Sequence, residues 1–142
     1  MLDTGYLTEF AAPQVVSGYT AAGTNPITSS GVDMEGWDGV EFSALLSVAN
    51  DNNYLTAGHA DADSGYVPTV AKTISGTSPS NEGVVLDILH PQKRWVNCIM
   101  TLGTSSAIYT IWARRYRARN APVVVAVPGT LALAQFNAPA TL

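Results

Sequence analysis

The sequence predicts an all-β protein built as an antiparallel β-sandwich or barrel. Short runs rich in Val, Ile, Leu, Tyr and Trp recur along the chain, and Gly, Pro, Asn and Ser separate them. Strand-like runs spaced by about 8 to 12 residues with turn residues between them are typical of this class. A helical period of useful length is confined to one candidate stretch, Thr130–Phe136.

The stretch from Val84 to Tyr116 carries the strongest strand pattern. Its three apolar and β-branched runs are separated by the turn sequences His90-Pro91 and Gly103–Ser106, which predicts an antiparallel meander. The expected strands are Val84–Leu89, Arg94–Thr101 and Ala107–Ala113.

A hairpin is expected upstream of this meander. Val40–Val48 is apolar at every second residue, as in a strand with one buried face. The polar turn Asn50–Asn53 then leads into a returning strand, Tyr54–Ala60. Thr69–Ile74 predicts a weaker strand, and the long polar segment Ser75–Gly83 is expected to cross between sheets.

We expect the β-sandwich domain to span residues 25–120, with an arm at each end of the chain. Residues 1–24 form the expected N-terminal arm because they lack a strong period, although Gln14–Ser17 has the composition of a short edge strand. Residues 121–142 form the expected C-terminal arm or tail, in which Val123–Val127 has strand composition. The expected core of the sandwich is Phe42, Leu46, Leu55, Leu86, Ile88, Val96, Cys98, Ile108 and Trp112.

Composition restricts the classes of function. The chain has 142 residues, enough for one domain, and only 13% are charged, against about 25% in an ordinary soluble protein. A net charge of −4 argues against a nucleic-acid partner, and no apolar run approaches the ~20 residues of a membrane span. A surface so poor in charge indicates that a partner covers part of it, and we expect the chain to be made in the cytoplasm without a signal peptide.

The residues that suggest chemistry are also explained by simpler structural roles. The H-x-D-x-D string from His59 to Asp63 and the acids between Asp33 and Asp38 resemble cation ligands, but solvated loops and polar turns explain both better. His90 has no adjacent nucleophile, and the chain has no nucleophile elbow or phosphate-binding glycine loop. We therefore expect no enzyme activity, no metal and no cofactor.

One charge cluster stands out, at the end of the last meander strand. If that strand continues, Arg115, Arg117 and Arg119 share one face, and Arg114 lies on the other. Two interpretations stay open: the guanidinium groups bind acidic groups of a partner, or they form a solvated strand end that guards against edge pairing.

Two sequence motifs carry a family resemblance. Gly36-Trp37-Asp38-Gly39-Val40-Glu41-Phe42 and the hairpin Val84–Val96, followed by Ala107–Arg119, resemble small structural proteins of tailed bacteriophages, close to capsid decoration or cement proteins. The resemblance covers about residues 35–119. It implies a jelly-roll β-sandwich that sits on the outer surface of the virion and bridges neighbouring subunits of the major capsid protein.

The resemblance implies the major capsid protein as a partner. The low charge and the apolar tail indicate further copies of the chain as a second partner, in a homodimer or homotrimer, and the composition predicts no nucleic acid and no membrane. A head-to-tail connector or tail-tube protein is one alternative. A carbohydrate-binding β-sandwich is another, and it requires that Trp37, Trp95 and Trp112 converge on a concave site.

The C-terminal tail is expected to belong to the partner-binding surface, together with the arginine cluster. It is apolar and uncharged, and such a segment exposed to water carries an aggregation risk. The expected partner-binding residues are Arg114, Arg115, Arg117, Arg119, Val123, Val125, Leu131, Leu133 and Phe136.

Overall fold

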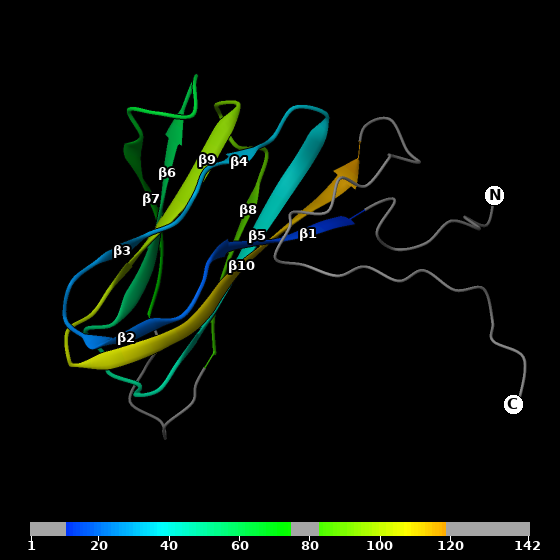
Figure 1. The fold of residues 1–142 in the computed structure, drawn as a ribbon. Coiled ribbons are helices and arrows are strands. Elements are labelled where there is room, and N and C mark those ends of the chain that lie inside the picture. The colour runs from blue at the N-terminus through cyan, green and yellow to red at the C-terminus, as the bar shows by residue number, and fades with distance from the viewer. Residues whose placement is uncertain (1–10, 75–82, 119–142) are drawn as a thin grey trace, which may run out of the picture.

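The fold is all-β, with two antiparallel sheets packed as layers of a sandwich (Figure 1). We analyse it in a computed structural model that describes residues 11–74 and 83–118. Among these residues there is no helix long and apolar enough to cross a membrane. The expectation of an antiparallel β-sandwich is confirmed.

The first sheet, sheet A, has the strand order β1-β10-β5-β8, and β2 also pairs with β10. All its pairings are antiparallel, and β10 is its longest strand. Its strands are β1 (Ala11–Ser17), β2 (Thr20–Gly23), β5 (Trp37–Leu46), β8 (Gly83–Leu89) and β10 (Ser106–Ala118).

The second sheet, sheet B, has the strand order β3-β9-β6-β7, with β4 also paired to β9. Its strands are β3 (Ile27–Thr28), β4 (Val32–Asp33), β6 (Tyr54–Ala60), β7 (Val67–Ile74) and β9 (Trp95–Thr101). The expected strands are present, but the predictions of a β5–β6 hairpin and of a β8–β9–β10 meander are wrong. Consecutive strands lie in opposite sheets, so that β5 pairs with β8 and β10, and β6 pairs with β7 and β9.

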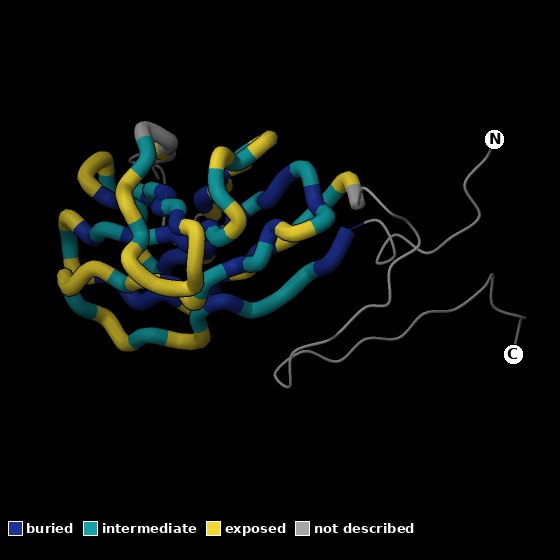
Figure 2. Tube along the Cα trace, turned by 90° about the horizontal axis from the view of Figure 1, so that it is seen from above, coloured by how far each residue is buried: buried dark blue, intermediate teal, exposed yellow. Residues whose placement is uncertain are grey.

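The core lies between the two sheets, where the buried stretches of the tube run in Figure 2. Its largest fully buried side chains include Phe42 and Leu46 from β5, Leu55 from β6 and Met100 from β9. Alternation explains this set, because every second side chain of a strand points to the same face. The expected core residues that are buried are Phe42, Leu46, Leu55, Leu86, Val96, Cys98 and Ile108.

Two expected core residues behave differently, and for one of them the prediction is wrong. Ile88 is only partly buried against the core, whereas Trp112 is 37% exposed. Ile108 pairs with Leu46 but Thr110 pairs with Leu45, so β10 carries one extra residue between these pairs. This β-bulge shifts the alternation by one position, and Trp112 therefore points away from the core.

Part of the expected N-terminal arm belongs to the sandwich. β1 runs along β10 in the register Ala11 opposite Tyr116, and Ala12 and Val16 pack into the core. The strand β10 extends past the expected Ala113 to Ala118, and this extension pairs with the first three residues of β1, Ala11 to Pro13. Residues 1–10, 75–82 and 119–142 lie outside the described residues, and with them the predictions for Val123–Val127 and Thr130–Phe136.

Gly39 permits a close approach between two strands of sheet A. The Tyr116 ring lies across Gly39, where an added Cβ would overlap it. From this position the Tyr116 hydroxyl donates a hydrogen bond of 2.5 Å to Asp87 Oδ1 on β8. One tyrosine thus links β10, β5 and β8, and it depends on the missing side chain of Gly39.

We expect Gly39→Ala to lower the free energy of unfolding by about 1 to 3 kcal/mol, since the methyl group displaces the Tyr116 ring. Gly18→Ala is the matched control, because an added Cβ there meets nothing within 4 Å. It should change stability by no more than about 0.5 kcal/mol. Urea unfolding followed by fluorescence measures both, and equal effects of the two substitutions would contradict the packing argument.

Candidate functional site: the outer face of sheet A

Exposed apolar side chains gather on sheet A. Of the large hydrophobic residues described as exposed, those on strands of sheet A are Leu45, Val85, Leu89, Tyr109 and Trp112. The strands of sheet B contribute only Val67 to the same group. Among the side chains that the structure describes, those of sheet A therefore account for most of the exposed large hydrophobic residues on the strands.

The register places several of these side chains side by side. One row across the sheet consists of Val15, Trp112, Ser43 and Val85, from β1, β10, β5 and β8 in that order. Leu45 lies two residues along β5 from Ser43 and points to the same face. We name Val15, Leu45, Val85 and Trp112 the apolar face, because together they span the sheet from β1 to β8.

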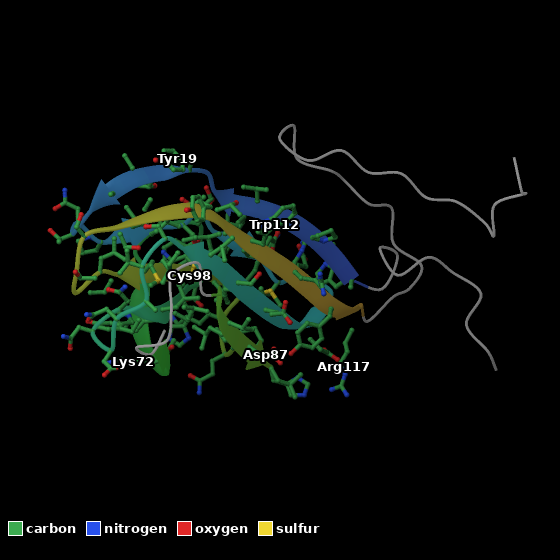
Figure 3. The ribbon with its side chains drawn as sticks, turned by 90° about the horizontal axis from the view of Figure 1, so that it is seen from below. Tyr19, Lys72, Asp87, Cys98, Trp112 and Arg117 are labelled. Atoms are coloured by element: carbon green, nitrogen blue, oxygen red, sulfur yellow. The ribbon has the colours of Figure 1, made fainter. Side chains whose placement is uncertain are left out.

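Tyr19, labelled in Figure 3, and Tyr109 lie beside the apolar face, near the end where β2 joins β10. The rings of Tyr19 and Tyr109 are stacked, with centroids 6.5 Å apart and an interplanar angle of 29°. Tyr109 is the extra residue of the β10 bulge, so the same irregularity turns both Tyr109 and Trp112 outward. The aromatic surface is a consequence of that bulge.

A charged row borders the apolar face on its other side. It consists of Pro13, Arg114, Glu41 and Asp87 in neighbouring strands. Arg114 is exposed and stands directly opposite Glu41, where opposite charges favour the pairing.

Tyr116 lies at the edge of this charged row. Burial, together with the hydrogen bond to Asp87, raises the pKa of Tyr116 to about 12. The phenol therefore stays neutral at physiological pH and keeps the hydrogen bond that it donates to the Asp87 carboxylate.

Arg115 is partly buried and makes contacts within the chain, and its role in the binding surface stays a prediction. Its guanidinium lies 4.9 Å from the centre of the Trp37 ring, and its Nη1 donates a hydrogen bond of 2.9 Å to the Asp33 backbone oxygen. Burial lowers the pKa of Arg115. This arginine holds the end of the sandwich together and does not face outward with Arg117.

Arg117 is exposed but departs from strand alternation. Its φ of 53° is in the left-handed region, which is uncommon for a residue with a side chain. The expectation that Arg115 and Arg117 share one face assumed a regular strand, and this conformation removes that regularity. Arg119 lies outside the described residues.

The acids suggested as cation ligands bind arginine, lysine and tyrosine groups. Arg94 donates to both carboxylate oxygens of Asp33, at 2.9 and 2.8 Å, and also lies 2.6 Å from Glu35. The hydrogen bond from Arg94 lowers the pKa of Asp33. These contacts tie β4 to the start of β9.

The acids of the loop after β6 also bind side chains of this chain. Asp61 pairs with Lys93 at 2.7 Å, and Asp63 accepts a hydrogen bond of 2.5 Å from the Tyr66 hydroxyl. Burial and Asp63 raise the pKa of Tyr66 above its usual range. Within residues 11–74 and 83–118, no three His, Cys, Asp or Glu side chains are grouped to hold a metal ion.

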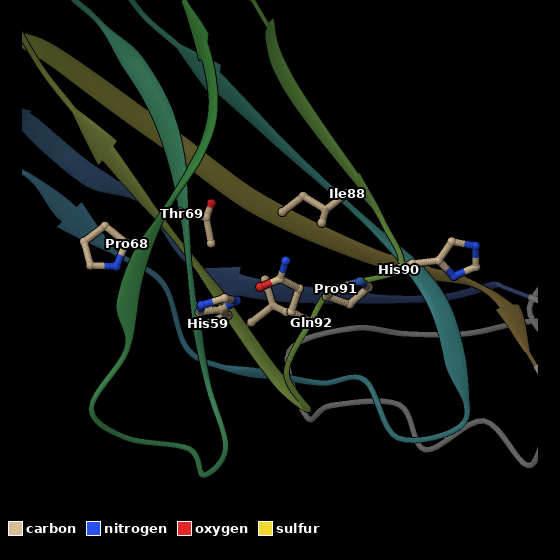
Figure 4. Close-up of a pocket in the computed structure, with 8 residues that line it drawn as sticks. His59, Pro68, Thr69, Ile88, His90, Pro91 and Gln92 are labelled. Carbon is tan, nitrogen blue, oxygen red and sulfur yellow. The ribbon is translucent and has the colours of Figure 1, made fainter.

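A pocket of about 390 Å³ lies between β8 of sheet A and the strands β6 and β7 of sheet B (Figure 4). His59 and His90 both line it, but the His90 ring points away from His59. The other lining residues are Pro68, Thr69, Ile88, Pro91, Gln92 and Val96, so the lining contains no carboxylate and no cysteine.

The three tryptophans occupy three different environments. Trp37 is buried beneath Arg115, Trp95 lies in sheet B with the Arg94 guanidinium 5.9 Å from its ring, and Trp112 lies on the outer face of sheet A. A carbohydrate site built from these three rings is therefore not present in this structure.

The comparisons with known proteins give no family. No family model and no curated protein match the sequence. Among solved structures, the Eiger TNF from S. frugiperda is 9% identical with a TM-score of 0.30, and the match covers 84% of this chain and 99% of that chain. A similarity this low carries no argument about function.

The sequence analysis did not predict the apolar face, although strand alternation around Glu41 and Asp87 indicates part of it. Asp87 and Glu41 are strand residues that must face solvent. Their positions place Val85 and Leu89 on the same face as Asp87, and Leu45 on the same face as Glu41. The exposure of Trp112 was not visible, because the bulge at Tyr109 arises only when β10 pairs with β5.

We expect Asp33→Asn to weaken the fold at neutral pH but not in acid. Because the folded-state pKa of Asp33 is lowered, its stabilisation is complete above the ordinary value near 3.8 and disappears as pH falls through the lower folded value. The urea midpoint should fall by about 0.2 to 0.5 M at pH 7 and be nearly unchanged at pH 2. Asp61→Asn, in a more exposed pair, is the control and should change neither midpoint measurably.

Proposed function

We propose that this protein is a virion structural protein that binds the outside of a bacteriophage head and cements neighbouring major capsid subunits. The observation that supports it best is the apolar face, in which Trp112, Val85 and Leu45 from three adjacent strands lie together on one outer face of the sandwich. Contiguous exposed apolar surface with a polar border is typical of protein interaction sites.

The physical task of a cement protein fits this surface. A DNA-filled shell is under internal pressure, and extra buried contact between subunits raises the free energy needed to separate them. A convincing interface buries about 1,000 Å² or more in total, so single contacts contribute modestly and a broad face is needed. The charged row of Arg114, Glu41 and Asp87 at its border would set orientation more than affinity.

The positions of Ala11 and Ala118 support binding of the shell through one side of the sandwich, the side of sheet A. Ala11 pairs with Tyr116, so the chain enters β1 and leaves β10 at the same end of sheet A. Residues 1–10 and 119–142 therefore attach to the sandwich on neighbouring strands. In this proposal the tail residues Val123, Val125, Leu131, Leu133 and Phe136 add contact area to the shell without enlarging the core, at a cost in ordering entropy.

The proposal also includes how the strands are connected and how copies of the protein assemble. We propose a jelly-roll winding, supported by consecutive strands such as β5 and β6, β8 and β9, and β9 and β10 lying in opposite sheets. We also propose that the copies associate with one another and with the major capsid protein on the outer surface of the virion, as a homodimer or homotrimer with closed symmetry.

Substituting the apolar face should remove the protein from particles. We expect the double variant Trp112→Ser, Val85→Ser to bind heads at least about tenfold more weakly, since large anchors at an interface each contribute more than about 1 kcal/mol. The measurement is occupancy per head after addition of purified protein to heads from a phage strain that lacks it.

The matched control is Val67→Ser on sheet B, because Val67 and Val85 are almost equally exposed, at 55% and 53%. Occupancy of this control should equal that of the unsubstituted protein. Normal occupancy of the double variant, with its unfolding midpoint unchanged, would reject the apolar face as the binding surface.

A further inference from the structure

Most edge strands of the two sheets carry features that oppose pairing with a further strand. β1 contains Pro13, and its register shifts between Val15 and Ser17. β2, β3 and β4 are short, and β7 contains Pro68 and the exposed Lys72. Proline, lysine, a bulge and a short length are the usual means by which proteins keep an edge strand from pairing with another chain.

The edge strand β8 carries none of these features. It has seven residues, contains no proline, lysine or arginine, and pairs with β5 without a register shift. Within residues 11–74 and 83–118, β5 is the one strand that pairs with it. Its one charged side chain, Asp87, accepts the hydrogen bond from Tyr116. An unguarded edge of this length indicates a place where another strand pairs.

The hydrogen bonds next to β8 show which of its backbone groups face this edge. The N–H of His90 donates to the backbone oxygen of Asp38 at 2.7 Å, in continuation of the β5–β8 register. Backbone groups of successive strand residues point to opposite sides, so the even-numbered residues of β8 also bond to β5. The residues whose N–H and C=O groups face the edge are therefore Gly83, Val85, Asp87 and Leu89.

The strand is complementary to an antiparallel copy of itself. With Leu86 opposite Leu86 of the second copy, all seven residues are paired. The edge-facing residues then meet one another in hydrogen-bonded pairs, Val85 with Asp87 and Gly83 with Leu89. A register with Asp87 opposite itself would set two carboxylates against each other, which is unfavourable.

This register also covers an apolar side chain that the single sandwich leaves partly exposed. Ile88 packs against the core but is only partly buried. Val84 of the second copy lies opposite Ile88 in this pairing, on the core-facing side of the joined sheet. The core-facing row of β8 therefore continues from one copy into the other.

We propose that two copies of this chain pair through β8, about a two-fold axis at Leu86, and join their two sheets A into one continuous sheet. The occupant of the edge is a second copy because the strand matches itself in length, hydrogen bonding and charge. The two-fold contact uses the β8 edge of both copies, so association through this edge stops at the dimer.

The joined sheet places both copies of the apolar face on the same side, since Val85, Leu45 and Trp112 all point away from the core. A dimer would thus offer a shell twice the apolar surface of one copy. This consequence rests on the proposed function, whereas the pairing itself does not.

The test is the oligomeric state of the full-length protein in reducing buffer without any shell. We expect sedimentation analysis between about 1 and 100 μM to show a monomer–dimer equilibrium. Val85→Pro removes an N–H that faces the edge and none that bonds to β5, so it should weaken association at least about tenfold. The matched control is Val85→Thr, which keeps the N–H and the branched Cβ and should associate like the unsubstituted protein.

A second measurement uses the unsubstituted protein, so it does not depend on how a variant folds. Amide hydrogen exchange is followed by NMR at the two ends of this concentration range. The amides of Val85, Asp87 and Leu89 should exchange at least about tenfold more slowly in the dimer than in the monomer. The amides of Leu86 and Ile88 are the internal control, because they bond to β5 and should be protected at both concentrations.

Three results would overturn the pairing. They are a monomer at the highest concentration, a dimer in which the edge amides exchange as in the monomer, and edge amides that are already protected in the monomer. The last result would assign the edge to a segment of the same chain. Particles are absent from both measurements, so a dimer that does not bind heads would reject the proposed function alone, and a monomer that binds heads would reject this pairing alone.

Discussion

The pairing of β10 with its neighbours is the constraint on which the rest of this structure depends. β10 pairs with β1, β2 and β5, and one extra residue at its bulge decides which of its side chains reach the core. Ile108 and Ile111 are both fully buried although they are three residues apart, which strict alternation forbids. The same shift moves Trp112 into solvent, so the core and the candidate binding surface are set by a single irregularity.

The residues on which the expected resemblance to phage structural proteins was based mostly maintain the fold. Gly36 adopts a φ of 81°, Gly39 makes room for Tyr116, and Phe42 is fully buried. Asp87 accepts the Tyr116 hydrogen bond, and Arg94 binds Asp33. A motif of this kind predicts how strands are joined and packed, and it carries little direct information about the surface that binds a partner.

The fold was predictable from sequence where local pattern and tertiary pairing agree. The strands β5, β6, β8 and β9 follow from alternation and turn residues that act locally. β1 was only partly recognised, at Gln14–Ser17, because Ala11 and Ala12 have weak strand preference and gain their place by pairing with Arg115 and Tyr116. The inward contacts of Arg115 were not predicted for a related reason. They join it to Trp37 and to Asp33, which is 82 positions away in the sequence, so no local pattern indicates them.

The exposed apolar side chains on the outer face of sheet A are the strongest physical argument for a partner. An ion pair exposed to water contributes about 0 to 1 kcal/mol, whereas covering a side chain the size of Val or Leu contributes about 1.5 to 3 kcal/mol before ordering costs. The apolar face therefore outweighs Arg114 and Arg117 as a source of affinity, even though the arginines dominate the sequence in this region. Trp112, Val85 and Leu45 lie on strands that pack against the core, so little further ordering entropy would be lost at the face itself when a partner covers it.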